Sequence, residues 1–155
     1  MSFQIKEIES LSGPKAHIYS VIIDGYYNTL LEQFFNENEG NENLQEMLNK
    51  IIVMARKTGC LKQFFKEGEG KLADGVVALS VGNLRLYGIY FNSTVILFGS
   101  GGEKNVRAYQ DDSKLNMKVE QIKYIAKKIY DAIRDREIIV SEDGELNFDN
   151  FEVYE

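Results

Sequence analysis

Six side chains in the central part of the chain carry groups that could act on a phosphodiester. Five are cationic, and lysine and arginine bind phosphate, arginine preferentially through two parallel hydrogen bonds. The sixth is a tyrosine, whose phenol accepts a proton only where neighbouring positive charge lowers its pKa from about 10. The six residues are Lys66, Lys71, Arg85, Lys104, Arg107 and Tyr109.

This combination fits the cleavage of RNA by attack of the 2′-hydroxyl. The reaction needs a group that takes the 2′ proton, a group that protonates the leaving 5′ oxygen, and cations around the pentacoordinate phosphorane. The alternative is a solvated strand face with ordinary surface lysines, and spacing alone favours that alternative. The residue types therefore define a hypothesis that needs further support.

The charge distribution predicts one positive face on a negative body. The whole chain has a net charge of −6, which argues against a general nucleic-acid binder. Residues 1–55 hold 3 basic and 8 acidic side chains, residues 56–107 hold 8 and 4, and residues 108–155 hold 7 and 12. The basic surplus thus coincides with the five cationic candidate residues.

Other chemistries find less support in the sequence. The chain has one His and one Cys, and the acidic stretches 111–112 and 142–145 lack the alternation of an EF-hand loop. We therefore expect neither a metal site nor a cofactor. His17 is either a general base or, as we favour, a structural side chain at the start of a strand. Cys60 is either a nucleophile or, as we favour, a buried and unreactive thiol.

The glycine-rich stretch 99–102 resembles a phosphate-binding loop only weakly. A P-loop requires Gly-Lys followed by Ser or Thr, whereas Lys104 follows Glu103 and precedes Asn105. We expect a flexible loop whose bare backbone could approach a phosphate.

Hydrophobic periodicity predicts a single α+β domain over residues 1–155. Alternating or β-branched runs indicate strands, and apolar residues at helical spacing indicate helices. A helical hairpin and a later helix should pack on an antiparallel sheet meander, followed by a short β-hairpin extension over 136–155. The predicted strands are 17–23, 63–66, 76–81, 84–91, 94–98, 138–140 and 145–148, and the predicted helices are 27–35, 44–55 and 114–134.

The sequence also suggests where the protein works. Residues 1–13 carry Lys6, Glu7 and Glu9, which interrupt the apolar run that a signal peptide needs. No segment is apolar over the length of a membrane span. A lone cysteine fits a reducing compartment. We therefore expect a cytoplasmic protein that does not associate with membranes.

Three segments resemble the RelE/HigB-like toxins, a family of mRNA interferases. Residues 63–66 and 75–79 resemble the family's lysine-bearing second strand and its lead into the core. Residues 84–90, Leu-Arg-Leu-Tyr-Gly-Ile-Tyr, are similar to its Arg-x-x-Tyr strand. Residues 98–99 and 103–109 resemble the loop that carries its lysine, arginine and catalytic tyrosine. The likeness covers residues 17–134 in the order strand, helical hairpin, meander and C-terminal helix.

The resemblance implies roles for the candidate residues. Arg85 and Arg107 would stabilise the phosphorane or act as the acid, and Tyr109 would be the base or a stacking residue. The RNA backbone would be held by Lys66, Lys71 and Lys104. The implied function is a metal-independent endoribonuclease of a toxin–antitoxin system, with mRNA, alone or on the ribosome, and a cognate antitoxin protein as partners. The alternative is a non-catalytic relative of the same fold that regulates or binds a protein partner.

Overall fold

A computed structural model of the chain describes residues 1–66, 75–105, 112–148 and 151. They form a mixed α and β fold, which confirms the predicted class. The helices are α1 (Leu30–Glu37), α2 (Leu44–Val53), which continues into a π-helical turn (Met54–Thr58), and α3 (Ser113–Arg134); a 3-10 turn (Lys62–Phe64) precedes β3. The strands are β1 (Phe3–Glu7), β2 (His17–Ile23), β3 (Phe65–Lys66), β4 (Val76–Val81), β5 (Leu84–Asn92), β6 (Val95–Glu103), β7 (Ile139–Val140) and β8 (Leu146–Asn147).

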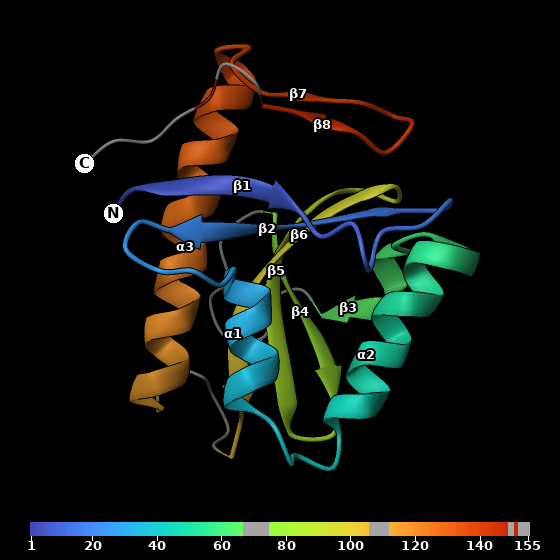
Figure 1. The fold of residues 1–155 in the computed structure, drawn as a ribbon, viewed down its shortest axis with the longest axis vertical. Helices are drawn as coiled ribbons and strands as arrows, with labels where there is room; N and C mark the ends of the chain where they lie inside the picture. Colours follow the sequence, from blue (N-terminus) through green and yellow to red (C-terminus); the bar gives the residue numbers. More distant parts are fainter. Residues whose placement is uncertain (67–74, 106–111, 149–150, 152–155) are drawn as a thin grey trace.

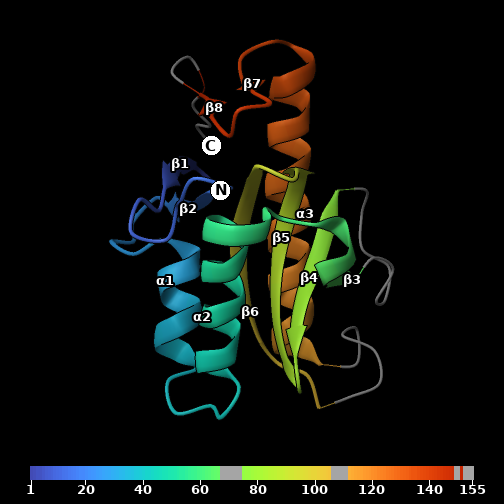
Figure 2. The same ribbon diagram turned by 90° about the vertical axis from the view of Figure 1, so that its right-hand side faces the viewer.

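The described strands β1 to β6 form one sheet in the order β1-β2-β6-β5-β4-β3. Helices α1 and α2 lie on one face of this sheet and α3 lies on the other, which gives three layers (Figures 1 and 2). Alternate residues of each strand therefore enter different cores. Tyr87 and Ile89 pack under α3, whereas Leu84 and Leu86 pack under α1 and α2.

The sheet is mixed, so the expected antiparallel sheet meander describes β3 to β6 but not the pairing of β2. Strand β2 pairs in parallel with β6, through His17 to Tyr19 against Val95 to Leu97. Strands β3 to β6 pair antiparallel with one another in chain order, as in a meander. Parallel neighbours need a long crossover connection, and the helical hairpin with the meander supplies it.

Strand β1 is an element that the sequence analysis missed. It pairs antiparallel with β2, from Phe3 opposite Ile23 to Glu7 opposite Tyr19. Its buried Phe3 and Ile5 alternate with exposed residues, which is the period-2 pattern of a half-buried strand. That pattern was present in the sequence but spans only five residues.

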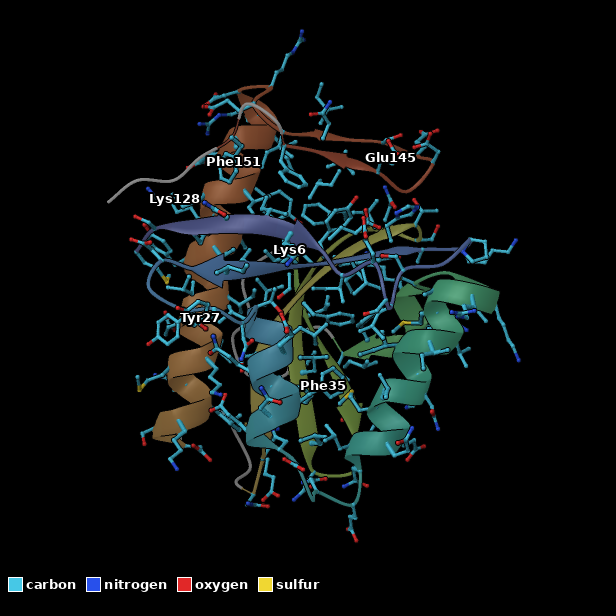
Figure 3. The ribbon with its side chains drawn as sticks, in the orientation of Figure 1. Lys6, Tyr27, Phe35, Lys128, Glu145 and Phe151 are labelled. Carbon is cyan, nitrogen blue, oxygen red and sulfur yellow. The ribbon has the colours of Figure 1, made fainter. Side chains whose placement is uncertain are left out.

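Helix α1 begins later than predicted because Thr29 caps it. The Thr29 hydroxyl accepts a hydrogen bond from the Glu32 N–H, and the Glu32 side chain accepts one from the Thr29 N–H, which forms a capping box. Tyr27, which the predicted helix included, is fully exposed in the β2–α1 connection (Figure 3). The Thr-x-x-Glu spacing is the sequence signal that locates this helix start.

The glycine run 99–102 lies within β6, so the prediction of a flexible loop was wrong. Gly101 and Gly102 pair with Leu86 and Arg85 of β5, and the register shifts by one residue between this segment and Phe98. A Cβ on Gly101 would collide with the Arg85 carbonyl, and a Cβ on Gly99 would come within 2.8 Å of Ile122 in α3. These glycines therefore allow close packing at a bulged strand.

The C-terminal hairpin packs onto the main body. Strand β7 pairs antiparallel with β8, and Leu146 donates its N–H to the Tyr19 hydroxyl at 2.9 Å. Ile138 and Leu146 are 1% and 4% exposed and belong to the core under α3. Phe151, labelled in Figure 3, has its ring centroid 6.0 Å from that of Phe3. Residues 136–148 thus contribute to the core of the fold.

Candidate functional site

Arg85 lies in β5 on the face of the sheet that α3 covers. It is two residues from Tyr87, whose side chain packs under α3, so strand periodicity gives Arg85 the same face. Its side chain is only 9% exposed. The guanidinium Nη1 donates to the Gly82 carbonyl at 2.7 Å and to the Leu84 carbonyl at 3.2 Å. These bonds direct the charged group toward the β4–β5 turn.

Lys104 begins the connection from β6 to α3 at that same turn. Its N–H donates to the Asn83 carbonyl at 2.7 Å, one residue after the carbonyl that Arg85 contacts. The structure therefore brings Arg85 and the backbone of Lys104 to one end of the sheet, where β4 and β5 meet (Figure 2). This is the end at which the predicted phosphate chemistry would take place.

Lys66 lies on the outer strand β3, farther from the turn. It is opposite Ala78, which is opposite Tyr87, so Lys66 shares the α3 face of the sheet with Arg85. Lys66 lies two strands away from Arg85 and is displaced by two residues along the strand direction. Their Cα atoms are therefore about 12 Å apart. Lys66 is exposed. It can therefore meet a polyanion on the same face, but not the same phosphate that Arg85 contacts.

Lys71, Arg107 and Tyr109 lie outside the described residues. Among the six predicted site residues, the structure thus describes Lys66, Arg85 and Lys104. It brings two of them to one turn and the third to the same face of the sheet.

A groove of about 620 Å³ lies along β6. Residues 100–103 of β6 form its floor, α1 contributes Leu30 and Glu37, and the N-terminal half of α3 contributes Leu115 and Lys118. Asn105 and Asp112 also line it. Asp112 caps α3 by accepting hydrogen bonds from the N–H groups of residues 114 and 115. Sequence reasoning missed this groove because it treated its floor as a loop.

The floor of this groove is an open strand edge. The β2–β6 ladder ends at Leu97 among the described residues, six residues before β6 ends. The bond from Lys104 to Asn83 marks a hydrogen-bonded pair of the β5–β6 ladder, and such pairs alternate with non-bonded ones. Gly102 is therefore bonded to β5, whereas Gly101 and Glu103 turn their N–H and C=O groups away from β5 and toward the groove.

An ion pair joins the two walls of the groove near Ser100. Lys118 Nζ of α3 lies 2.9 Å from Glu37 Oε1 of α1 and 3.1 Å from the Ser100 hydroxyl. The Ser100 residue is 4% exposed, so this contact closes the groove at one end. The segment from Gly101 to Glu103 lies beyond it.

His17 has a carboxylate partner, and Cys60 is buried. His17 Nδ1 lies 2.7 Å from Glu7 Oε2, and its ring lies beneath the β7–β8 turn, where a Cβ on Gly144 would contact it at 2.6 Å. Cys60 is fully buried, and burial raises the pKa of its thiol to about 12. Such a thiol carries almost no thiolate at neutral pH and is a poor nucleophile.

Within residues 1–66, 75–105, 112–148 and 151, no three His, Cys, Asp or Glu side chains gather as metal ligands would. None of the described helices combines the length and apolar content needed to cross a bilayer.

No protein-family model, no curated protein and no solved structure matches this chain.

Proposed function

We propose that this chain is a metal-independent endoribonuclease of the toxin type, which cleaves mRNA alone or on the ribosome. The observation that supports the proposal is the position of the Arg85 guanidinium. Its Nη1 is hydrogen-bonded to the Gly82 carbonyl, at the same turn where the Lys104 N–H bonds to Asn83. The element order from β2 through α1, α2, β4, β5 and β6 to α3 is the order that the resemblance to the RelE/HigB-like family implies.

In the proposed reaction the 2′ oxygen attacks phosphorus and the bond from phosphorus to the 5′ oxygen breaks. Tyr109, as phenolate, takes the 2′ proton. A guanidinium stays protonated in proteins, so Arg85 and Arg107 act by stabilising the charge on the phosphorane. The leaving 5′ oxygen takes a proton from solvent, and the products carry a 2′,3′-cyclic phosphate and a 5′-hydroxyl. Lys66, Lys71 and Lys104 hold the RNA backbone.

The test is cleavage of mRNA by the purified full-length chain in the presence of a metal chelator, with and without ribosomes. We expect ends with a 2′,3′-cyclic phosphate. Tyr109→Phe and Arg85→Ala should each lower the rate by about 100-fold or more, because each removes a proton acceptor or a phosphorane cation. Arg134→Ala is the matched control, since Arg134 is 69% exposed and pairs with Asp131 and Asp135 on the last turn of α3.

Folding of the Arg85 variant is checked by circular dichroism, because its guanidinium bonds also hold the turn. Arg85→Lys keeps the charge and should retain more activity than Arg85→Ala. The proposal fails if the native chain cuts no RNA under either condition and its expression without a cognate antitoxin leaves growth unchanged.

A second function is favoured by the limited exposure of Arg85 and by the carboxylates that line the groove among the described residues, namely Glu37, Glu103 and Asp112. In this alternative the chain is a non-catalytic protein of the same fold that regulates or binds a protein partner. Replacing Arg85 and Arg107 by glutamine would then leave its cellular effect unchanged, whereas the nuclease would lose its effect. Measuring growth with the double variant distinguishes the two functions. Under either function we place the protein in the cytoplasm.

A further inference from the structure

We propose that the open edge of β6 from Gly101 to Glu103 is the docking site for one extended peptide segment of a partner protein. The segment would add to the sheet as a strand between α1 and α3. This inference does not rest on RNA cleavage, because it follows from the pairing of the sheet.

The backbone of β6 sets the chemistry of the ligand. Gly101 and Glu103 both direct an N–H and a C=O away from β5, at the two-residue spacing of an antiparallel ladder. An extended peptide presents complementary groups at the same spacing, which is the basis of strand addition to sheet edges. Gly101 and Gly102 have no side chains, so the incoming backbone can approach closely.

The helices on either side of the groove leave room for a single peptide strand but not for a second copy of this chain. Helices α1 and α3 stand on opposite sides of the β6 edge and contribute Leu30, Glu37, Leu115 and Lys118 to the groove. Paired strands lie about 5 Å apart, whereas a helix with its side chains is about 10 Å wide. Two copies that met edge to edge would bring their helices into collision before their strands could pair. A single peptide segment has no such obstacle.

The charges of the groove favour a peptide over RNA. Among the described residues, three carboxylates and two ammonium groups line it, for a net charge of −1. The residues are Glu37, Glu103, Asp112, Lys114 and Lys118. Sites that track a nucleic-acid backbone are positively charged. We therefore expect a partner segment with no proline and with a lysine or arginine near Glu103.

Glu103→Pro tests the proposal at a single hydrogen-bond donor. The Glu103 N–H points away from β5, so proline removes an outward donor and leaves the β5–β6 bonds intact, as proline does at sheet edges. Glu103→Ala is the matched control, because both variants lose the bond that Asn41 Nδ2 donates to the Glu103 carboxylate at 2.7 Å. Only the proline variant also loses the N–H.

The probe is a phage-displayed library of random linear peptides, selected on the immobilised full-length chain. Selected peptides should bind Glu103→Pro about tenfold more weakly than Glu103→Ala, because both variants lose the carboxylate and only the proline variant also loses the N–H donor. A bound peptide should also slow hydrogen exchange of the Gly101 and Glu103 amides. Methylating alternate backbone nitrogens of a selected peptide supplies a second measurement: one alternate set should abolish binding and the other should leave it intact.

Three results would overturn the proposal. One is a library that yields no binder to the native chain. Another is a set of peptides that bind Glu103→Pro as tightly as Glu103→Ala and tolerate both methylation patterns. The third is protection of the Gly101 and Glu103 amides by a single-stranded oligoribonucleotide instead of a peptide. None of these results bears on whether the chain cleaves RNA, which the ribonuclease assay measures separately.

Discussion

At the scale of single residues, burial decides which reactive groups keep their reactivity. Arg85 is nearly buried yet stays hydrogen-bonded to two carbonyls, so its charge is compensated at the β4–β5 turn. Cys60 is buried among apolar side chains, and the Tyr90 hydroxyl donates to its carbonyl at 2.7 Å. Burial therefore leaves the hydrogen-bonded Arg85 charged but makes the Cys60 thiol unreactive.

Cys60 provides a prediction on reactivity and pH. Its pKa rises from 9.0 to about 12 because burial disfavours the thiolate. The folded state therefore holds the proton more tightly than the unfolded state. The resulting contribution to the free energy of unfolding is complete below pH 9 and is lost as pH rises toward 12.

A thiol-specific chromogenic reagent at pH 8 should thus label the urea-unfolded chain quickly and the native chain hardly at all. The alkaline loss of stability should be smaller in Cys60→Ala than in the native chain. Rapid labelling of the native chain would contradict this account.

At the scale of elements, β6 is where the candidate site is organised. One side pairs with β5, and the other pairs with β2 only as far as Leu97. The glycine run lets this strand bulge beside β5 and pass under Ile122 of α3. The open edge, the groove and the Lys118–Glu37 contact all follow from that arrangement.

The two neighbouring glycines of β6 should respond differently to alanine. A methyl group on Gly101 meets the Arg85 carbonyl, which is backbone and cannot turn aside, whereas a methyl on Gly102 meets only Leu115 Cδ2 at 3.6 Å. We expect Gly101→Ala to lower the free energy of unfolding by about 1–3 kcal/mol through overpacking. Gly102→Ala should change it by less than about 0.5 kcal/mol. Urea unfolding followed by circular dichroism measures both, and equal effects would contradict the bulged packing.

At the scale of the whole molecule, segments distant in the sequence complete each core. The layer under α3 contains residues from β1, from the meander and from the C-terminal hairpin. The hairpin is also hydrogen-bonded to β2 through Tyr19 and Leu146. Deletion of residues 136–155 would therefore expose core, so loss of partner binding in such a deletion would not identify the hairpin as a binding element.

Adjacent isoleucines test the role of the hairpin segment without deleting it. Ile138 is 1% exposed and Ile139 is 58% exposed. Ile138→Ala should cost about 2–4 kcal/mol because it leaves a cavity in the core under α3. Ile139→Ala should cost less than about 0.5 kcal/mol. Denaturant titration of the full-length variants gives both values; if the Ile138 variant is as stable as the native chain, the segment does not belong to the core.

The fold class, the apolar stripes of α2 and α3 and the strands of the meander could be predicted from the sequence, because they depend on periodicity within a short window. The sequence did not reveal that β2 runs parallel to β6, that residues 99–102 form a strand, or that Arg85 points to a turn. The physical reason is that strand pairing and burial depend on residues far away in the chain. The Gly101 environment, for example, is set by Arg85, and that of Gly99 by Ile122. A cluster of glycines is predicted to be a loop from local composition alone. Here the glycines lie in a strand, where close packing leaves no room for a side chain.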